Sequence, residues 1–172
     1  MGPVVDFPQG RWEFSKWQGS PDRFLAAMPE DWQADFLLYL ETCTERMELY
    51  AISDNDQIMA GGAVLKGLPP DMELFEKETR RFVEKGYLYI GFLFVDAAHR
   101  GQNIGSSWLK HLFKALEGQG FWLTVEDPGL IKFYEKNGFR WIGTLKQGSI
   151  CEDLLVLEPN DHDNPTSNAT SS

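Results

Sequence analysis

Hydrophobic positions along the chain recur in two kinds of spacing, which predict a mixture of strands and helices. Segments that alternate, or that are apolar almost throughout, predict strands over 11–17, 48–53, 58–65, 87–95, 121–125, 139–146 and 150–158. Apolar residues spaced three and four apart predict helices over 20–43, 71–86, 106–116 and 128–138. The order of these elements indicates an α/β domain built from packed layers.

Local capping signals mark where two of these helices begin and end. Ser20 followed by Pro21 predicts a helix start, and Pro29 divides the stretch over 20–43 into two pieces. Gly86 predicts the end of the helix over 71–86. The expected buried stripe of that helix is Leu74, Phe75, Phe82 and Val83.

Composition fits one globular domain. Hydrophobic residues make up 42% of the 172 positions, so we expect a single domain over 1–158 and a polar, disordered tail over 159–172. No apolar run reaches the ~18 residues that span a bilayer, so we expect no membrane partner. Cys43 and Cys151 are too few for a disulfide framework or a metal site. A reducing, cytoplasmic setting is the simplest account.

Charge is distributed unevenly along the chain. The net charge of −10 argues against nucleic acid as the main partner, because binding phosphates requires a basic surface. Residues 91–150 carry 7 basic and 5 acidic side chains, whereas residues 1–90 carry 9 and 16. Two interpretations stay open: an anionic ligand binds the less acidic segment while a neutral or cationic one approaches the acidic remainder, or the charge serves solubility alone.

The loop after strand 87–95 has the residues of an anion-binding site. Gly101 and Gly105 let the main chain approach a ligand closely, and the first N–H groups of the next helix point toward the same place. Arg100 can add a charge-assisted hydrogen bond. The spacing fits neither the Gly-Lys-Ser/Thr of a P-loop nor the G-x-G-x-x-G of a dinucleotide site. Taken alone, the loop favours a simple strand-to-helix turn.

A second motif downstream changes this interpretation. HRGQNIG (99–105) is followed by FYEKNGF (133–139), and together these motifs resemble the GNAT superfamily of acetyl-CoA-dependent N-acetyltransferases, best over residues 87–157. The family's loop pattern is Gln/Arg-x-x-Gly-x-Gly/Ala, in which Asn103 stands in place of the middle glycine. Asparagine tolerates left-handed backbone angles better than most residues, so we expect the loop to keep its shape.

The resemblance implies a fold and a cofactor. The fold would be a GNAT-like mixed, mostly antiparallel central sheet of about six to seven strands with helices on both faces, splayed between strands 87–95 and 121–125. The loop would bind the diphosphate of acetyl-CoA, mostly through main-chain N–H groups, and the end of strand 87–95 would pair with the pantetheine arm. The implied cofactor-binding residues are Leu93, Phe94, Val95, Arg100, Gly101, Gln102, Asn103, Ile104, Gly105, Ser106 and Asp127.

The resemblance also implies a reaction. The acetyl group of acetyl-CoA would pass to a primary amine by direct attack through a tetrahedral intermediate, with a main-chain N–H near Val95 stabilising the oxyanion. Tyr134 matches the family tyrosine near the thioester sulfur, and its phenol would protonate the departing thiolate. Phe133 is expected to pack in the core.

Departures from the family pattern keep alternatives open. Asp127 stands where many members have asparagine, and a carboxylate cannot donate the hydrogen bond that an amide donates. Tyr89 stands where some members carry a glutamate base, and a phenol is a poor base at neutral pH, so we name no base. A non-catalytic, CoA-binding or regulatory protein is the alternative function, and transfer of a longer acyl group is a third.

The acceptor is the least determined part of the prediction. We expect a small-molecule or peptide amine, bound by residues within 20–90, which the two motifs do not cover. The acidic first half would suit a cationic amine, but it would equally suit solubility. The sequence leaves both a monomer and a homodimer open.

Overall fold

The chain folds into strands and helices in the order that the sequence predicts. The computed structural model describes residues 4–7, 10–55 and 57–159. The strands are β1 (Val4–Phe7), β2 (Gly10–Lys16), β3 (Met47–Asp54), β4 (Gln57–Lys66), β5 (Leu88–Val95), β6 (Phe121–Val125), β7 (Arg140–Gln147) and β8 (Ile150–Leu157). The α-helices are α1 (Pro21–Ala27), α2 (Gln33–Thr42), α3 (Glu76–Glu84), α4 (Ile104–Ala115) and α5 (Ile131–Lys136). The predicted polar tail lies outside the described residues from position 160 onward.

All seven predicted strands are present, and β1 raises the number of described strands to eight. β1 was not predicted, because four residues that include Asp6 carry only a weak strand signal. β1 pairs with β2 in an antiparallel hairpin, from Val4 opposite Glu13 to Phe7 opposite Gly10. The predicted mostly antiparallel sheet is confirmed, with one strand more than expected.

The first of two compact units comprises Met1–Leu65 and Ile90–Leu112. Its strands follow one another in the order β1-β2-β3-β4-β5. β3 and β4 form the predicted hairpin, with an irregularity in register after Ile52. The larger part of β5, from Ile90 onward, therefore belongs to this unit, and so does most of α4.

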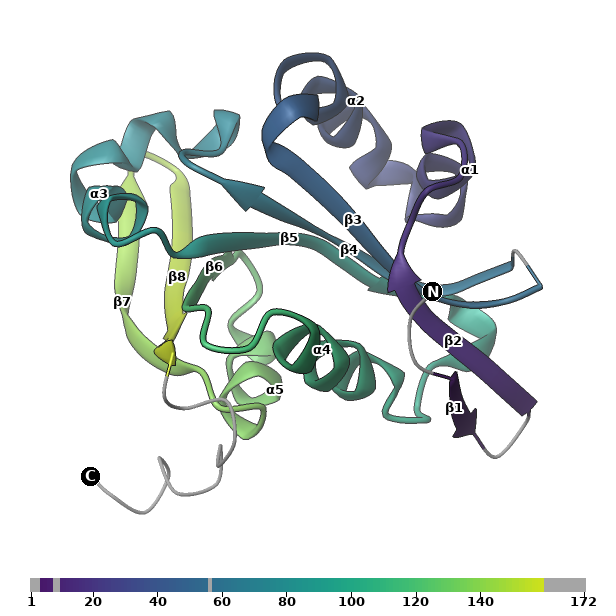
Figure 1. Ribbon diagram of the computed structural model, residues 1–172. Helices are drawn as coiled ribbons and strands as arrows, with labels where there is room; N and C mark the ends of the chain where they lie inside the picture. The colour runs from purple at the N-terminus through teal and green to yellow at the C-terminus, as the bar shows by residue number, and fades with distance from the viewer. Residues whose placement is uncertain (1–3, 8–9, 56, 160–172) are drawn as a thin grey trace. The chain divides into compact units, whose positions relative to one another are not determined.

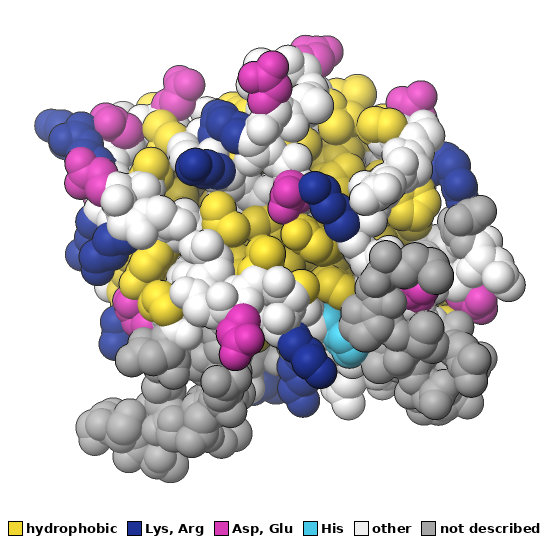
Figure 2. All heavy atoms as spheres, viewed as in Figure 1, with side chains coloured by type: hydrophobic (Ala, Val, Ile, Leu, Met, Phe, Trp, Pro, Cys, Tyr) yellow, Lys and Arg dark blue, Asp and Glu magenta, His cyan; other side chains and the backbone are white. Residues whose placement is uncertain are grey.

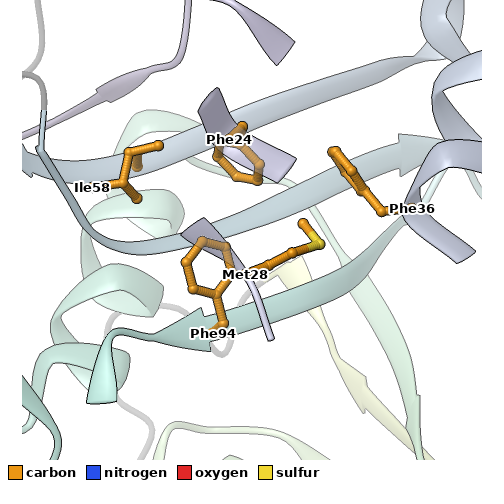
Figure 3. Packing of buried hydrophobic residues seen from close by; sticks show 6 residues of the cluster. Phe24, Met28, Phe36, Ile58 and Phe94 are labelled. Carbon is orange, nitrogen blue, oxygen red and sulfur yellow. The ribbon is translucent and has the colours of Figure 1, made fainter. Parts of the chain in front are cut away.

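Helices cover both faces of the strands in the first unit (Figure 1). On one face, α1 and α2 pack onto the sheet through a buried cluster, part of which Figure 3 shows. The cluster consists of Phe24, Met28, Phe36, Ala51, Ile58 and Phe94. On the other face, α4 contributes Trp108, whose Nε1–H donates to the Tyr50 carbonyl at 3.0 Å and whose ring lies edge-on to Phe14.

Two adjacent glycines on β4 let aromatic rings approach the strand closely from both sides. Gly61 and Gly62 face opposite sides, because neighbouring residues on a strand alternate. A Cβ on Gly61 would lie 2.8 Å from Cζ of Phe24, and a Cβ on Gly62 would lie 2.6 Å from Cζ2 of Trp108. Such distances are too short for real atoms, so the two rings occupy the space that side chains would otherwise need.

The second compact unit comprises Lys66–Tyr89 and Phe113–Ser172, described as far as residue 159. β6 pairs with β8, and β8 with β7, both in antiparallel registers. The start of β5 pairs in parallel with β6 through Leu88 opposite Phe121 and Tyr89 opposite Trp122. This ladder of two residue pairs is short for an eight-residue strand, in agreement with the predicted splay of these two strands.

The core of the second unit also has helices on both faces. Phe121 and Trp122 are neighbours on β6 and fully buried, and they face opposite sides. Trp122 stacks with Phe82 of α3 at 5.9 Å between ring centroids, whereas Phe121 packs against Phe113 at the end of α4 at 5.6 Å. The expectation of helices on both faces is confirmed.

The capping signals act as predicted. Ser20 accepts a hydrogen bond from the Asp22 N–H at 3.1 Å, and α1 ends before Pro29. Gly86 has φ +78° and donates its N–H to the Val83 carbonyl at 3.0 Å. The helical segment predicted over 71–86, which includes α3, therefore ends at this residue. These features were predictable because each depends on residues that are close in sequence.

The predicted buried stripe over 71–86 is right at Phe75 and Phe82 and wrong at Leu74. The segment begins as a 3-10 helix over Pro70–Phe75, in which residues three apart share a face. Met72 and Phe75 are therefore buried together. Leu74 turns outward and is 52% exposed.

The described surface is mixed in character. Figure 2 shows acidic, basic and hydrophobic side chains side by side on one face, with neither sign of charge covering it. The large hydrophobic side chains that are exposed are Leu37, Leu38, Leu74, Leu130, Trp141 and Ile150. Of the described helices, none combines the length and the apolar character needed to cross a membrane.

Candidate functional site

The loop between β5 and α4 lies in the first unit and is fixed at both ends. Asp96, directly after β5, donates its N–H to the Met59 carbonyl at 2.8 Å. Its carboxylate accepts from the Ala98 N–H at 3.3 Å and so caps a short 3-10 helix. At the other end, the Ser107 N–H donates to the Asn103 carbonyl at 3.0 Å and closes the first turn of α4.

Two residues of this loop adopt left-handed backbone angles. Gly101 has φ +83° and Asn103 has φ +59°. A Cβ added to Gly101 would meet nothing within 4 Å, so this position favours glycine for its backbone angle and not for lack of space. Asn103 thus has the left-handed conformation that its residue type predicts.

The first turn of α4 presents main-chain groups to the loop. Ile104 and Gly105 are buried, and their N–H groups precede the first intrahelical hydrogen bond. The helix dipole adds partial positive charge at this end. Gln102 and Ser106 are half-exposed.

Arg100 is exposed beside this turn. Its Nε donates to the Val95 carbonyl at 3.3 Å, which ties the side chain back to the end of β5. A guanidinium has five N–H donors, so the same side chain can still contact an anion. The loop and its neighbours thus carry the main-chain and side-chain donors that a diphosphate requires.

The end of β5 offers mainly its backbone. Phe94 is 4% exposed and points into the buried cluster of the first unit (Figure 3), so its side chain is not available to a ligand. Leu93 and Val95 are half-buried. These three residues can therefore contact a cofactor mainly through N–H and C=O groups, as the predicted pairing with the pantetheine arm requires.

Phe92, one residue earlier, has an unusual conformation. Its φ of +57° lies in the left-handed region, which bulky residues rarely adopt. Its ring is held edge-to-face by Tyr39 at 4.8 Å and by Phe36 at 5.3 Å between centroids. Packing from α2 therefore supports a strained backbone directly before Leu93–Val95.

Tyr134 lies on α5 in the second unit. It is 8% exposed, and its ring is nearly perpendicular to those of Phe133 and Phe139, at 4.9 and 5.5 Å between centroids. Burial raises the pKa of Tyr134 well above its ordinary value, so the phenol keeps its proton at neutral pH. A buried, neutral phenol can donate a proton. Phe133, expected in the core, is half-buried.

Asp127 also lies in the second unit, at the end of β6. Its carboxylate accepts a hydrogen bond from the Gly129 N–H at 2.9 Å and caps the 3-10 helix over Pro128–Leu130 that leads into α5. The side chain is exposed. In the structure this carboxylate therefore holds its own turn, which accounts for an aspartate at this position without any cofactor contact.

In the second unit, polar residues that the sequence did not predict as a group lie near Tyr89. Thr124 on β6 donates from Oγ1 to Oε1 of Glu152 on β8 at 2.7 Å. Tyr89, at the start of β5, is buried beside them, and burial raises its pKa far above the usual range. The negative charges of Asp71 and Glu152 raise the pKa of Tyr89 further. No motif contains these residues, which come from separate strands.

Neither cysteine nor any acidic group suggests a metal. Within residues 4–7, 10–55 and 57–159, no group of three or more His, Cys, Asp or Glu side chains is arranged to hold an ion. Cys43 is buried and Cys151 is exposed, and both are free thiols.

The comparison with protein families gives a clear match. A model described as the acetyltransferase (GNAT) family matches residues 12–139. The chain belongs to the GNAT family of acetyltransferases. Among curated proteins, no sequence matches this GNAT chain.

Solved structures with the same fold include several acetyltransferases. FeeM, an N-acyl amino acid synthase from uncultured soil microbes, is 16% identical with a TM-score of 0.66, and the alignment covers 94% of this chain and 98% of FeeM. A Bacillus subtilis acetyltransferase in complex with CoA is 14% identical with a TM-score of 0.59, covering 86% and 98%. A GNAT acetyltransferase from Elizabethkingia anophelis with acetyl-CoA bound is 18% identical with a TM-score of 0.55, covering 86% and 97%. These similarities establish the GNAT fold.

GNAT acetyltransferases use acetyl-CoA, and the first unit fits the diphosphate of that cofactor. The fit rests on the left-handed angles of Gly101 and Asn103, the main-chain donors at the start of α4 and the charge of Arg100. The open space around a Cβ at Gly101 leaves room for a ligand against the main chain. Asn103 is therefore compatible with the cofactor of the family.

Proposed function

We propose that this GNAT chain transfers the acetyl group of acetyl-CoA to a primary amine. The observation that carries the proposal is the loop at 100–106, in which Asn103, at the position of the middle glycine in the resembled motif, adopts a left-handed angle. The main-chain N–H groups of Gly101 to Ser106 would bind the diphosphate, and Arg100 would add a charge-assisted contact. The main chain of Leu93–Val95 would pair with the amides of the pantetheine arm.

Acetyl-CoA, when bound, supplies an activated acyl carbonyl, and the residues of this chain orient it and move protons. Tyr134 would hold the proton that the leaving sulfur needs, because its buried phenol is neutral at pH 7. A main-chain N–H near Val95 would stabilise negative charge on the acyl oxygen. Asp127 stays a proposed cofactor-binding residue, and its carboxylate, which accepts from the Gly129 N–H, also positions the turn before α5.

The acceptor and the domain boundaries belong to the same proposal. We expect a small-molecule or peptide amine that contacts residues within 20–90, and we expect residues 1–158 to act as one catalytic domain. The family model, which ends at residue 139, and the β7–β8 hairpin beyond it support this extent.

A reducing, cytoplasmic setting remains our prediction because both cysteines are free thiols.

Calorimetric titration with acetyl-CoA tests cofactor binding, and two substitutions of Asn103 sharpen the test. Asn103→Gly keeps the left-handed angle and should bind acetyl-CoA within about 2-fold of wild type. Asn103→Ala must adopt an angle that costs about 1 kcal/mol or more, so binding should weaken by about 5- to 10-fold. Equal affinity of the two variants would show that the loop geometry does not govern binding.

A screen of primary amines for CoA release tests the transfer itself. Release with at least one amine is the expected result. No binding at millimolar acetyl-CoA would overturn the proposal, whereas binding without release across the panel would favour the non-catalytic, CoA-binding alternative. A series of acyl-CoA lengths in the same assay tests transfer of longer acyl groups, which the N-acyl amino acid synthase among the neighbours makes worth including.

A further inference from the structure

Tyr89 marks the place in the second unit where a base is missing. The family resemblance puts a glutamate at this position in some members, but here the residue is a buried phenol, 7% exposed. Burial first, and then the negative charge of Asp71, raise the pKa of Tyr89 far out of the physiological range. Tyr89 therefore cannot accept a proton as a phenolate at neutral pH.

A carboxylate lies close to Tyr89 on another strand. Glu152 is half-buried on β8, and its charge is one of those that raise the pKa of Tyr89. Thr124 donates from Oγ1 to Oε1 of Glu152 at 2.7 Å and so fixes one of the two carboxylate oxygens. Tyr89 pairs with Trp122, two residues before Thr124 on β6, so Tyr89 and Thr124 lie on the same face of the sheet.

The register of β6 and β8 places Glu152 on the same face as Thr124 and Asp153 on the opposite face. Thr124 pairs with Leu154, so Glu152 is the diagonal neighbour two residues along β8 on the same face. Asp153 points to the opposite side, where its Oδ1 accepts from Trp141 Nε1 and Thr144 Oγ1, each at 3.0 Å. The two adjacent carboxylates therefore have separate surroundings.

The charges that face Glu152 are negative. Burial raises its pKa above the ordinary value, the hydrogen bond from Thr124 lowers it, and the charges of Asp71 and Glu126 raise it again. The result is a carboxylate that binds a proton more readily than an exposed glutamate does. Such a group is better matched to accepting a proton near neutral pH.

Two further residues of the second unit bear on the surroundings of Tyr89. Tyr134, the proposed proton donor, is among the groups whose charge raises the pKa of Tyr89. Trp122 packs against Tyr89 at 4.8 Å between centroids and is fully buried. Its Nε1–H has no hydrogen-bond partner among the described residues.

We propose that Glu152 is the general base that accepts the proton of the acceptor amine. The inference rests on the proposed acetyl transfer. The nitrogen of the neutral amine forms the C–N bond with the acyl carbon and passes one proton to Oε2 of Glu152. The C–S bond breaks, its electron pair stays on sulfur, and Tyr134 gives sulfur a proton. Proton return from Glu152 to Tyr134 through solvent restores both groups.

Glu152→Gln tests this role, with Asp153→Asn as the matched control. The first variant should lower turnover by about 10²- to 10⁴-fold, which is the usual contribution of a general base. The second removes a carboxylate one position away, on the other face, and should change turnover by less than about 3-fold. Calorimetry should give the same affinity for acetyl-CoA in both variants, and circular dichroism should confirm that both are folded.

The pH profile separates a base from a group that only positions the amine. In wild type, kcat/KM should fall with acidity below the pKa of Glu152, and this limb should disappear in Glu152→Gln. A rise in KM with the acidic limb retained would overturn the proposal, since it would indicate a binding role. Equal turnover in the two variants would overturn it as well, while leaving acetyl transfer itself in place.

A measurement without cofactor completes the test. Carbon NMR of the labelled glutamate carboxyls, with Glu152→Gln for assignment, should give Glu152 a titration midpoint above the ordinary value of about 4.5. A midpoint at or below that value would contradict the proposal. If wild type releases no CoA with any amine, the proposed function and the base fail together, which distinguishes that outcome from failure of the base alone.

Discussion

Two half-buried glutamates on antiparallel strands, Glu48 in the first unit and Glu152 in the second, have pKa values shifted in opposite directions. Glu48 on β3 accepts a hydrogen bond from the Tyr50 hydroxyl at 3.0 Å and one from the Lys16 amine at 2.8 Å. The Lys16 contact is the main reason that the pKa of Glu48 is lowered. Glu152 also accepts from a hydroxyl, but its charged neighbours are carboxylates, and its pKa is raised.

The difference shows that burial in a sheet does not by itself decide what a carboxylate can do. Both glutamates are half-buried, and both are bonded to a hydroxyl on a strand residue. Only Glu48 has a cation, which holds it in the ionised form and suits a structural ion pair. Glu152 keeps a stronger affinity for protons, as a catalytic base requires.

Replacing two buried tyrosines, Tyr134 in the second unit and Tyr50 in the first, should give the largest difference in turnover. Tyr134→Phe should lower turnover by about 10²-fold or more, because the leaving sulfur would lose its proton donor, while acetyl-CoA affinity should stay nearly constant. Burial raises the pKa of Tyr50 to about 12, but its hydroxyl is bonded to Glu48. Tyr50→Phe should therefore leave turnover within about 2-fold and cost about 1 kcal/mol of stability.

Steady-state kinetics and urea unfolding of both variants measure this contrast. Matched turnover in Tyr134→Phe and Tyr50→Phe would remove Tyr134 from the mechanism. Weakened acetyl-CoA binding by Tyr134→Phe would instead give the residue a binding role.

Thr124→Val should have an intermediate effect. The substitution keeps the shape of the side chain and removes the hydrogen bond that lowers the pKa of Glu152. The acidic limb of the kcat/KM profile should therefore move to higher pH, and turnover at neutral pH should fall by about 5- to 20-fold, since one charge-assisted hydrogen bond is lost. Thr144→Val, which removes a hydroxyl bonded to Asp153, is the control that should leave the limb unchanged.

The smallest effect is on stability, and its sign differs between the two glutamates. The lowered pKa of Glu48 gives stability that is present above the unfolded-state pKa and is lost as pH falls. The raised pKa of Glu152 gives stability that is present below the unfolded-state pKa and is lost as pH rises. Because both groups are partly exposed, each contribution should stay below about 1 kcal/mol.

Urea unfolding of Glu48→Gln and Glu152→Gln between neutral and mildly acidic pH checks these signs. Relative to wild type, Glu48→Gln should be less stable at neutral pH and nearly equal in acid. Glu152→Gln should be equal to or more stable than wild type at neutral pH and lose that advantage in acid. The same trend for both variants would mean that Lys16 does not make the difference between the two glutamates.

Much of the fold could be predicted because it depends on residues that are close in sequence. The Ser20 cap, the break at Pro29 and the end of the helix at Gly86 are all local decisions. The loop at 100–106 is local as well, and its expected left-handed asparagine follows from the conformational preference of one residue. Leu74 was misplaced because the sequence pattern does not distinguish the first turn of a 3-10 helix from an α-helix.

Of the two residues proposed to transfer protons, only one was predictable from the sequence, for a physical reason. Tyr134 belongs to a continuous motif, whereas Glu152 meets Thr124 across 28 positions of sequence through the pairing of two strands. In the sequence ICEDLLVLE, Glu152 and Asp153 are two adjacent acidic residues with no sign of which is buried. Only the register of β8 against β6 separates them.

The paired glycines of β4 have a consequence for how the strand finds its place during folding. If β4 shifted by two residues, Met59 and Ala60 would stand opposite the rings of Phe24 and Trp108, where no Cβ fits. A shift by one would place Ala60 at the position of Gly61 or Ala63 at the position of Gly62, so a methyl group would meet Phe24 or Trp108. The alignment of this hairpin thus depends on two missing side chains, because each shifted alignment places a Cβ against an aromatic ring.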